Sequence, residues 1–322
     1  MARVASIDCG TNSIRLLVAD VTVREDGSSW LRDVHREMRV VRLGQGVDAT
    51  GRLAPEAIER TRAALRDYTN VLRRKGVERA RMVATSATRD ASNRDEFFSM
   101  TAELLGTEAE VISGDTEAQL SFTGAVGDLD PAEGPFLVVD VGGGSTELVL
   151  GGSSMSASAG SAAEVEAGRS VDVGCVRITE RCLRSDPPTA AEVAAAEEFA
   201  SEVLAEAFDT VPVAKASRWV GVAGTITTLS AVAQGLEKYD SERTHLSRLS
   251  LDDIRQTTDR LLSMTHEQRA AITSIHPGRV DVIGGGAVVV RALAEQLAER
   301  AGITELLVSE HDILDGIALS LV

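Results

Sequence analysis

The sequence of 322 residues is poor in the residue types that several common sites require. With three cysteines and no CxxC pair, it argues against a disulfide framework and a zinc cluster. It has three lysines and no GxxxxGK[ST] segment, so a Walker P-loop is excluded. No glycine run fits GxGxxG followed by a helix, and HExxH and GxSxG are also missing, which leaves nicotinamide binding, zinc proteases and serine hydrolases without support.

Long hydrophobic runs are also lacking. No stretch approaches the roughly 18 consecutive apolar residues that a membrane helix needs. A strand-like run starts near residue 3 and leaves no room for a signal peptide. We therefore expect a reduced, cytoplasmic protein that does not bind membranes.

Acidic residues outnumber basic ones by 49 to 33, and the formal net charge of −16 argues against nucleic-acid binding. Residues 1–100 nevertheless hold 18 Lys and Arg against 14 Asp and Glu, whereas the rest holds 15 against 35. An anion is therefore better received by the first part of the chain. We expect the outer part of a polyanion to run past Arg39 and Arg42 there.

Strand-like and helix-like runs alternate along the chain, which is typical of an α/β fold. Apolar, β-rich runs over residues 3–7 and 14–21 flank a polar turn. A helix is predicted to begin at Pro55 and to end at Gly76. The segment 151–168, rich in Gly, Ser and Ala, is interpreted as a surface loop.

An internal repeat indicates a duplicated architecture. Residues 4–17 and 137–149 each contain a hydrophobic strand, an aspartate (Asp8 or Asp140), a Gly/Ser/Asn turn and a second strand. Such a turn can direct several backbone N–H groups to one point and so bind an anion. The aspartate that ends the preceding strand suits a divalent cation.

Two further glycine clusters keep two interpretations open. They are residues 221–224 and 284–286, and the second leads into a helix expected over 287–300. Each cluster can place backbone amides near a ligand. Close packing of a helix against a strand explains them as well.

Four ordered motifs resemble those of the exopolyphosphatase/guanosine pentaphosphate phosphatase family. The motifs are residues 8–15 (DCGTNSIR), 84–93 (ATSATRDASN), 112–120 (ISGDTEAQL) and 140–147 (DVGGGSTE). The resemblance continues through residues 174–177 and 276–281 and spans essentially the whole chain. It implies two actin-like, ribonuclease H-like domains of the actin/Hsp70/sugar-kinase superfamily, with the active site in the cleft between them.

We place the first domain at residues 1–121 and the second at residues 122–310. The first is the more basic lobe and the second the acidic one. A C-terminal helix over 311–322 is expected to pack back on the first domain. The resemblance also leads us to expect a homodimer.

The resemblance assigns roles to matching residues. Glu117 orients and deprotonates the attacking water, and Arg89 holds the transferred phosphoryl group. Asp8, Asp140 and Glu147 lie near the metal, Mg²⁺ or Mn²⁺. The phosphate-binding residues are Thr11, Asn12, Ser13, Gly142, Gly143, Gly144, Ser145 and Thr146. Without the resemblance, Glu117 would be interpreted as an exposed glutamate at the start of a helix.

The implied activity is metal-dependent hydrolysis of the terminal phosphoanhydride bond of inorganic polyphosphate, with release of orthophosphate. Guanosine pentaphosphate (pppGpp) is the alternative substrate, and nucleoside triphosphates remain possible. From other classes, an ATP-dependent sugar or acetate kinase and a noncatalytic actin-like assembly protein stay open. Thr116 and Leu314 stand where many relatives carry Glu and Arg, which weakens any transfer of substrate preference.

Overall fold

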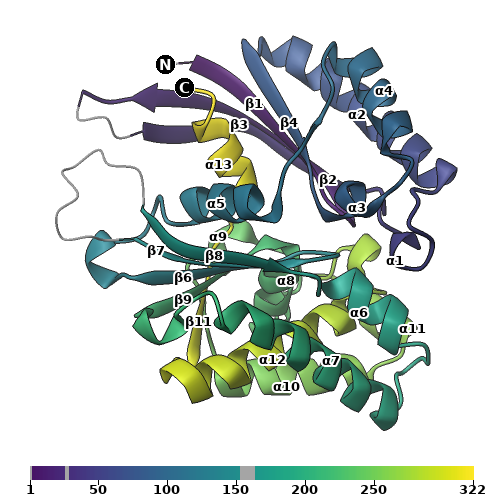
Figure 1. Cartoon of the computed structure of the whole chain (residues 1–322), viewed down its shortest axis with the longest axis vertical. Helices are drawn as coiled ribbons and strands as arrows, with labels where there is room; N and C mark the ends of the chain where they lie inside the picture. Colours follow the sequence, from purple (N-terminus) through teal and green to yellow (C-terminus); the bar gives the residue numbers. More distant parts are fainter. Residues whose placement is uncertain (1, 26–28, 153–163) are drawn as a thin grey trace.

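The computed structural model describes residues 2–25, 29–152 and 164–322. Two lobes are visible in Figure 1, each built on one mixed sheet with helices against it. The first lobe contains β1 (Ala2–Cys9), β2 (Ser13–Val23), β3 (Ser29–Val40), α1 (Val47–Thr50), α2 (Pro55–Lys75), β4 (Arg79–Ala84), α3 (Ser86–Asp90), α4 (Arg94–Leu105) and β5 (Glu110–Val111).

The second lobe is larger. Its strands are β6 (Phe136–Val141), β7 (Thr146–Gly151), β8 (Val165–Val171), β9 (Arg218–Val222), β10 (Arg248–Ser250) and β11 (Glu305–Val308). Its helices are α6 (Cys175–Cys182), α7 (Ala190–Phe208), α8 (Ala223–Ala233), α9 (Ser241–Thr244), α10 (Leu251–Ser263), α11 (His266–Ala270) and α12 (Ile283–Ala301). Short 3-10 turns are Pro131–Glu133, Val213–Lys215 and Pro277–Arg279.

The two sheets repeat one topology, which confirms the duplicated α/β architecture. The first has the order β3-β2-β1-β4-β5, and the second contains the matching order β8-β7-β6-β9-β11, with β10 added at the edge. In both, three antiparallel strands are followed by two parallel ones. Asp8 pairs with Arg15 across the first hairpin, and Asp140 pairs with Glu147 at the equivalent position of the second.

Local sequence signals explain most element boundaries. Helix α2 has Pro55 at its first turn and ends at Gly76, which is left-handed with φ 66°. Both ends were predicted, because proline suits the first helical position and glycine adopts positive φ without strain. Strand β3 was missed, because its half-exposed edge position leaves charged residues on both faces and no alternating apolar pattern.

The glycines of α12 serve close packing. The helix begins at Ile283, four residues before its expected start, and includes the glycine run 284–286. A Cβ added at Gly285 would lie 2.6 Å from the backbone oxygen of Cys175 in α6. Between the two interpretations left open for this run, the structure therefore supports helix packing.

The segment 151–168, expected as a loop, is partly strand. Strand β7 continues to Gly151 and β8 begins at Val165, so the two form an antiparallel hairpin. The rest of the expected loop, residues 153–163, lies outside the described residues.

Two helices connect the lobes: α5 (Gly114–Ala125) and α13 (Ile313–Leu319). They lie against each other between the two sheets in Figure 1. Helix α5 packs Phe122 on the second sheet, and α13 packs Leu314 on β1 and β2 of the first. The domain boundary drawn at residue 121 therefore falls inside a helix that belongs to the interface.

Glycine allows these two helices to touch. A Cβ at Gly124 would lie 1.8 Å from the backbone oxygen of Asp312, and one at Gly316 would lie 2.0 Å from that of Leu120. Both positions face backbone, which cannot rotate away as a side chain can.

No helix of the described segments is long and apolar enough to cross a bilayer.

We expect Gly316→Ala to lower the free energy of unfolding by about 1–3 kcal/mol, because overpacking would push α13 away from α5. Gly127→Ala is the matched control, since its Cβ would meet nothing closer than 3.9 Å. Urea unfolding of both variants measures the difference. Equal stabilities would show that the helix crossing tolerates the methyl group.

Candidate active site

The two turns of the repeat have the same internal hydrogen bond and lie face to face. Gly10 N–H donates to Ser13 O at 3.0 Å in the first, and Gly142 N–H donates to Ser145 O at 3.0 Å in the second. A Cβ added at Gly143 would lie 2.8 Å from Cβ of Thr11. The second turn therefore needs glycine, because its backbone contacts the first turn directly.

The carbonyl groups of the first turn are bonded from one side. Thr11 O accepts from Gly44 N–H at 2.8 Å, and Asn12 O accepts from Arg42 N–H at 2.8 Å. In a trans peptide, the N–H group points opposite to the C=O group of the same peptide unit. The N–H groups of Asn12 and Ser13 therefore face the other way, toward the cavity that both residues line.

The second turn follows the same rule with different donors. The carbonyl oxygens of glycines 142–144 accept from Cys175 N–H, Val176 N–H and Arg177 Nε, at 3.0, 2.9 and 2.8 Å in that order. Their peptide N–H groups, up to that of Ser145, are directed away from α6. Two sets of amides from two lobes thus converge, as the anion site predicted from the repeat requires.

Most predicted site residues line one cavity of about 80 Å³ between the turns. They are Asp8, Thr11, Asn12, Ser13, Glu117, Asp140, Gly142, Gly143, Gly144 and Ser145. Arg89 and Glu147 are not part of the lining: Arg89 contacts it through Glu117, and Glu147 accepts from Ser170 Oγ at 2.7 Å. Thr146 does not join it, because its hydroxyl donates to Val173 O at 2.6 Å inside the second lobe.

Glu117 is buried, with 8% of its surface exposed, and is not the exposed helix-start residue that sequence alone favours. Arg89 Nη1 donates to its Oε2 at 2.6 Å and also to Ile112 O at 3.1 Å. Burial raises the pKa of Glu117 to about 7, although the positive charge of Arg89 opposes the shift. A carboxylate that gains and loses a proton near neutral pH suits general-base chemistry.

Three further carboxylates surround this pair. Burial raises the pKa of Asp140 to about 6, and Ser121 Oγ donates to its Oδ2 at 2.8 Å. Burial and the neighbouring Glu117 raise the pKa of Glu147 well above its usual range. Burial also raises the pKa of Asp8, against the opposing charge of Arg15. The structure thus brings together all four carboxylates that the sequence singled out.

Two arginines that were not named as site residues face the cavity, one from each lobe. Arg15 Nη2 lies 2.7 Å from Asp8 Oδ2, and its Nη1 contacts Asp312. Arg279 is half-buried, donates to Thr228 Oγ1 at 3.2 Å and has no carboxylate partner among the described residues. A guanidinium without a carboxylate partner on the cavity wall is available to bind an anion. Both arginines lie in segments that carry the family resemblance, Arg15 in residues 8–15 and Arg279 in residues 276–281.

The path expected for a polyanion past Arg39 and Arg42 stays a prediction, and the structure shows which partners these arginines have. Arg39 is paired with Glu37 at 2.8 Å and also contacts Asp67. Arg42 reaches across to the second lobe and lies 3.0 Å from Asp281. Both guanidinium groups are half-exposed and paired with carboxylates, so a bound polyanion would compete with these partners.

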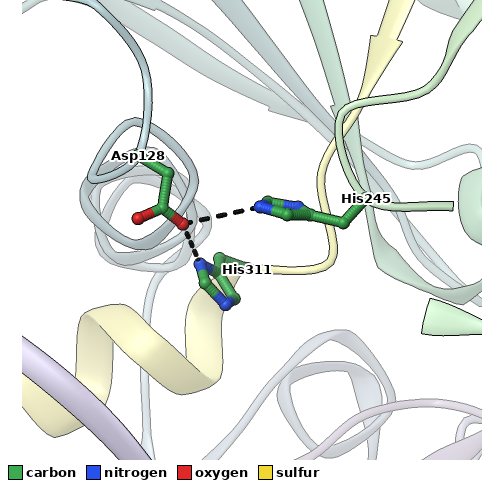
Figure 2. A group of neighbouring side chains, drawn as sticks. All are labelled: Asp128, His245 and His311. Atoms are coloured by element: carbon green, nitrogen blue, oxygen red, sulfur yellow. Dashed lines mark ion pairs between the residues drawn. The ribbon is translucent and has the colours of Figure 1, made fainter. Parts of the chain in front are cut away.

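A second cluster of titratable groups lies where α5 and α13 meet the second lobe, as Figure 2 shows. His311 Nδ1 and His245 Nε2 lie 2.5 and 3.6 Å from the same oxygen of Asp128. These contacts lower the pKa of Asp128 and raise that of His311. Glu310 N–H donates to His245 Nδ1 at 3.3 Å, so the proton of that ring is on Nε2. The three side chains form a compact polar cluster that shares no residue with the cavity between the turns.

The model of the Ppx/GppA phosphatase family matches residues 21–321. The chain belongs to this family. Exopolyphosphatase 2 of Mycobacterium tuberculosis is 59% identical to it, over 100% of this chain and 99% of that protein. A solved exopolyphosphatase-like protein is 44% identical with a TM-score of 0.92, and covers 99% of this chain and 98% of its own. The Ppx/GppA enzyme of Aquifex aeolicus is 32% identical with a TM-score of 0.77, over 99% of both chains.

Membership in the Ppx/GppA phosphatase family confirms the resemblance read from the four motifs. It also decides against the sugar or acetate kinase and the noncatalytic assembly protein. The individual roles of Glu117, Arg89 and the metal-site carboxylates stay predictions, which the geometry above now makes specific.

We expect Asp140→Asn to raise the melting temperature at pH 8 in the absence of divalent cations. Because the pKa of Asp140 is raised in the folded state, ionisation of this carboxyl lowers the stability of the wild-type protein as pH rises through about 6. The difference in melting temperature between the variant and wild type should therefore be smaller near pH 5. Asp20→Asn is the control of opposite sign. Arg3 and Arg32 lower the pKa of Asp20 to about 2, so this variant should be less stable at both pH values. If Asp140→Asn melted at a lower temperature than wild type at pH 8, the ionised Asp140 would not be destabilising the folded state.

Proposed function

We propose that this phosphatase removes the terminal orthophosphate of inorganic polyphosphate with a water molecule that Glu117 activates. The observation that carries the proposal is the position of Glu117 on the cavity between the two amide turns. A buried carboxylate of raised pKa stands there beside the guanidinium of Arg89. The 59% identity to an exopolyphosphatase supports the choice of substrate.

The terminal phosphoryl group would sit between the amides of Ser13 and Ser145. Glu117 accepts a proton from water while the water oxygen forms a bond to the terminal phosphorus. The bridging P–O bond breaks, and its electron pair stays on the shortened chain. Phosphoryl transfer depends mainly on positioning and charge neutralisation, which the amides and Arg89 provide. The proton on Glu117 then leaves to solvent with the departing orthophosphate.

We expect the same cavity to bind a divalent cation. Asp8 Oδ1 is buried and has no hydrogen-bond partner in the described part of the chain. With Asp140 and Glu147 nearby, it offers the oxygen ligands that Mg²⁺ or Mn²⁺ prefers. When bound, the ion would neutralise charge on the phosphate oxygens. Asp8, Asp140 and Glu147 are the residues we expect to hold it or its waters.

Guanosine pentaphosphate is a second candidate substrate. A cavity of about 400 Å³ adjoins the phosphate cavity, and Arg15 and Arg279 line both. Its wall includes Tyr239 and Thr227, so it has room for a group beyond the reacting phosphates. Phosphate release from short polyphosphate, long polyphosphate, ATP and pppGpp under one set of conditions would rank these substrates.

Glu117→Gln should lower kcat on polyphosphate by roughly two to four decades, because it keeps the shape of the side chain and removes its basicity. Asp115→Asn, on an exposed residue of the same helix, is the matched control and should act like wild type. In wild type, kcat/KM should rise with pH and level off above about 7, as Glu117 loses its proton. Normal turnover of Glu117→Gln would refute its role as the base.

Magnesium should raise the melting temperature more at pH 8 than at pH 5.5. Binding to the folded state alone stabilises it, and protons compete for the carboxylates at the lower pH. Asp8→Asn should reduce this shift, whereas Asp115→Asn should keep it. Thermal unfolding with millimolar MgCl₂ tests this without any assay of activity. An equal shift in wild type and Asp8→Asn would place the cation elsewhere.

A further inference from the structure

Arg177 in α6 links the second amide turn to the first lobe. Its Nε donates to Gly144 O at 2.8 Å, its Nη2 donates to Asp90 Oδ2 at 3.0 Å, and its Nη1 contacts Asp48. Gly144 belongs to the second lobe, whereas Asp48 and Asp90 belong to α1 and α3 of the first. One buried guanidinium, with 9% of the residue exposed, therefore binds groups from both lobes.

The repeat shows that this link is specific to the second turn. At the equivalent position of the first turn, Asn12 O accepts from the backbone N–H of Arg42, so main chain alone orients that peptide. In the second turn a side chain takes this place. The direction of the Ser145 N–H, which belongs to the same peptide unit as Gly144 O, thus depends on Arg177.

The Nη2 end of the Arg177 guanidinium contacts the neighbour of the arginine that is predicted to bind the phosphoryl group. Asp90 follows Arg89 directly in α3, and Arg89 holds Glu117. If the lobes separate, Arg177 loses Asp48 and Asp90. Gly144 O and α3 then lose the group that fixes them relative to each other.

We propose that Arg177 is a positioning residue, which makes the reactive arrangement of the Ser145 amide and Arg89 depend on closure of the two lobes. This inference rests on the proposed phosphatase chemistry of the cavity. A displacement of about 1 Å in a catalytic group is enough for a hundredfold loss in rate. The effect therefore belongs to kcat more than to KM.

Arg181 offers a matched control. It lies one turn further along α6, and its Nη2 donates to the same Asp48 at 2.7 Å. No hydrogen bond joins it to the glycine turn or to Asp90 in the described structure. Arg181→Gln therefore removes an ion pair between the lobes and leaves the orientation of the turn alone.

The test compares Arg177→Gln, Arg177→Lys and Arg181→Gln in steady-state polyphosphate hydrolysis and in small-angle X-ray scattering. We expect kcat of Arg177→Gln to fall roughly 10- to 100-fold with a smaller change in KM, and its radius of gyration to increase. Arg177→Lys keeps the charge that faces the first lobe but lacks the planar fork. It should scatter like wild type and still turn over slowly. Arg181→Gln should keep kcat within about threefold.

Equal kcat values for Arg177→Gln and Arg181→Gln would overturn the inference, as would a lower melting temperature of Arg177→Gln with unchanged kcat. If wild type releases no phosphate from polyphosphate, the proposed function fails instead. In that case the scattering data alone test whether Arg177 holds the lobes together. A larger radius of gyration for Arg177→Gln than for Arg181→Gln supports this role, and equal radii of gyration reject it.

Discussion

The structure depends on the contact between the two turns of the repeat, around which four buried carboxylates come together. Such a cluster opposes folding, because each buried carboxylate resists ionisation and repels the next. The raised pKa values of Glu117, Asp140 and Glu147 record this conflict. A protein retains such strain where it gains function from it, and cationic or protonated partners relieve it. Here the candidate partners are a divalent ion, a proton on Glu117 and Arg15.

The repeat is symmetric in its backbone and asymmetric in its chemistry. Both turns have the same hydrogen bond and direct amides toward one point. At equivalent register positions, however, the first hairpin carries Arg15 opposite Asp8, and the second carries Glu147 opposite Asp140. Two copies of one anion-binding hairpin thus differ in charge across the cleft. This difference suits one site to the phosphate chain and the divalent cation that we propose it binds.

Besides the contact between the two turns, the lobes meet in two further places. Where α5 crosses α13, the two main chains are in direct contact at Gly124 and Gly316. The two helices therefore have little freedom to move relative to each other. On the other side, the lobes meet through ion pairs of Arg177, Arg181 and Arg42. Arg181 and Arg42 are partly exposed, so their ion pairs separate at lower cost than packed backbone. Arg177 is buried and loses its partners only when the lobes part. The crossing is therefore suited to act as the pivot, and the ion pairs as the part that opens.

Short-range patterns determined much of this protein. The strand–turn–strand repeat, the ends of α2 and the phosphate-turn residues could be read from the sequence, because propensity and turn chemistry act over a few neighbours. The family motifs added Glu117 and Arg89, which spacing alone would have left as surface residues. Three features could not be predicted from the sequence. They are the edge strand β3, the carboxylate partners of Arg39 and Arg42, and the lack of such a partner for Arg279 in the described residues. Each depends on which charges from distant segments meet, and only the packing of the two lobes decides that.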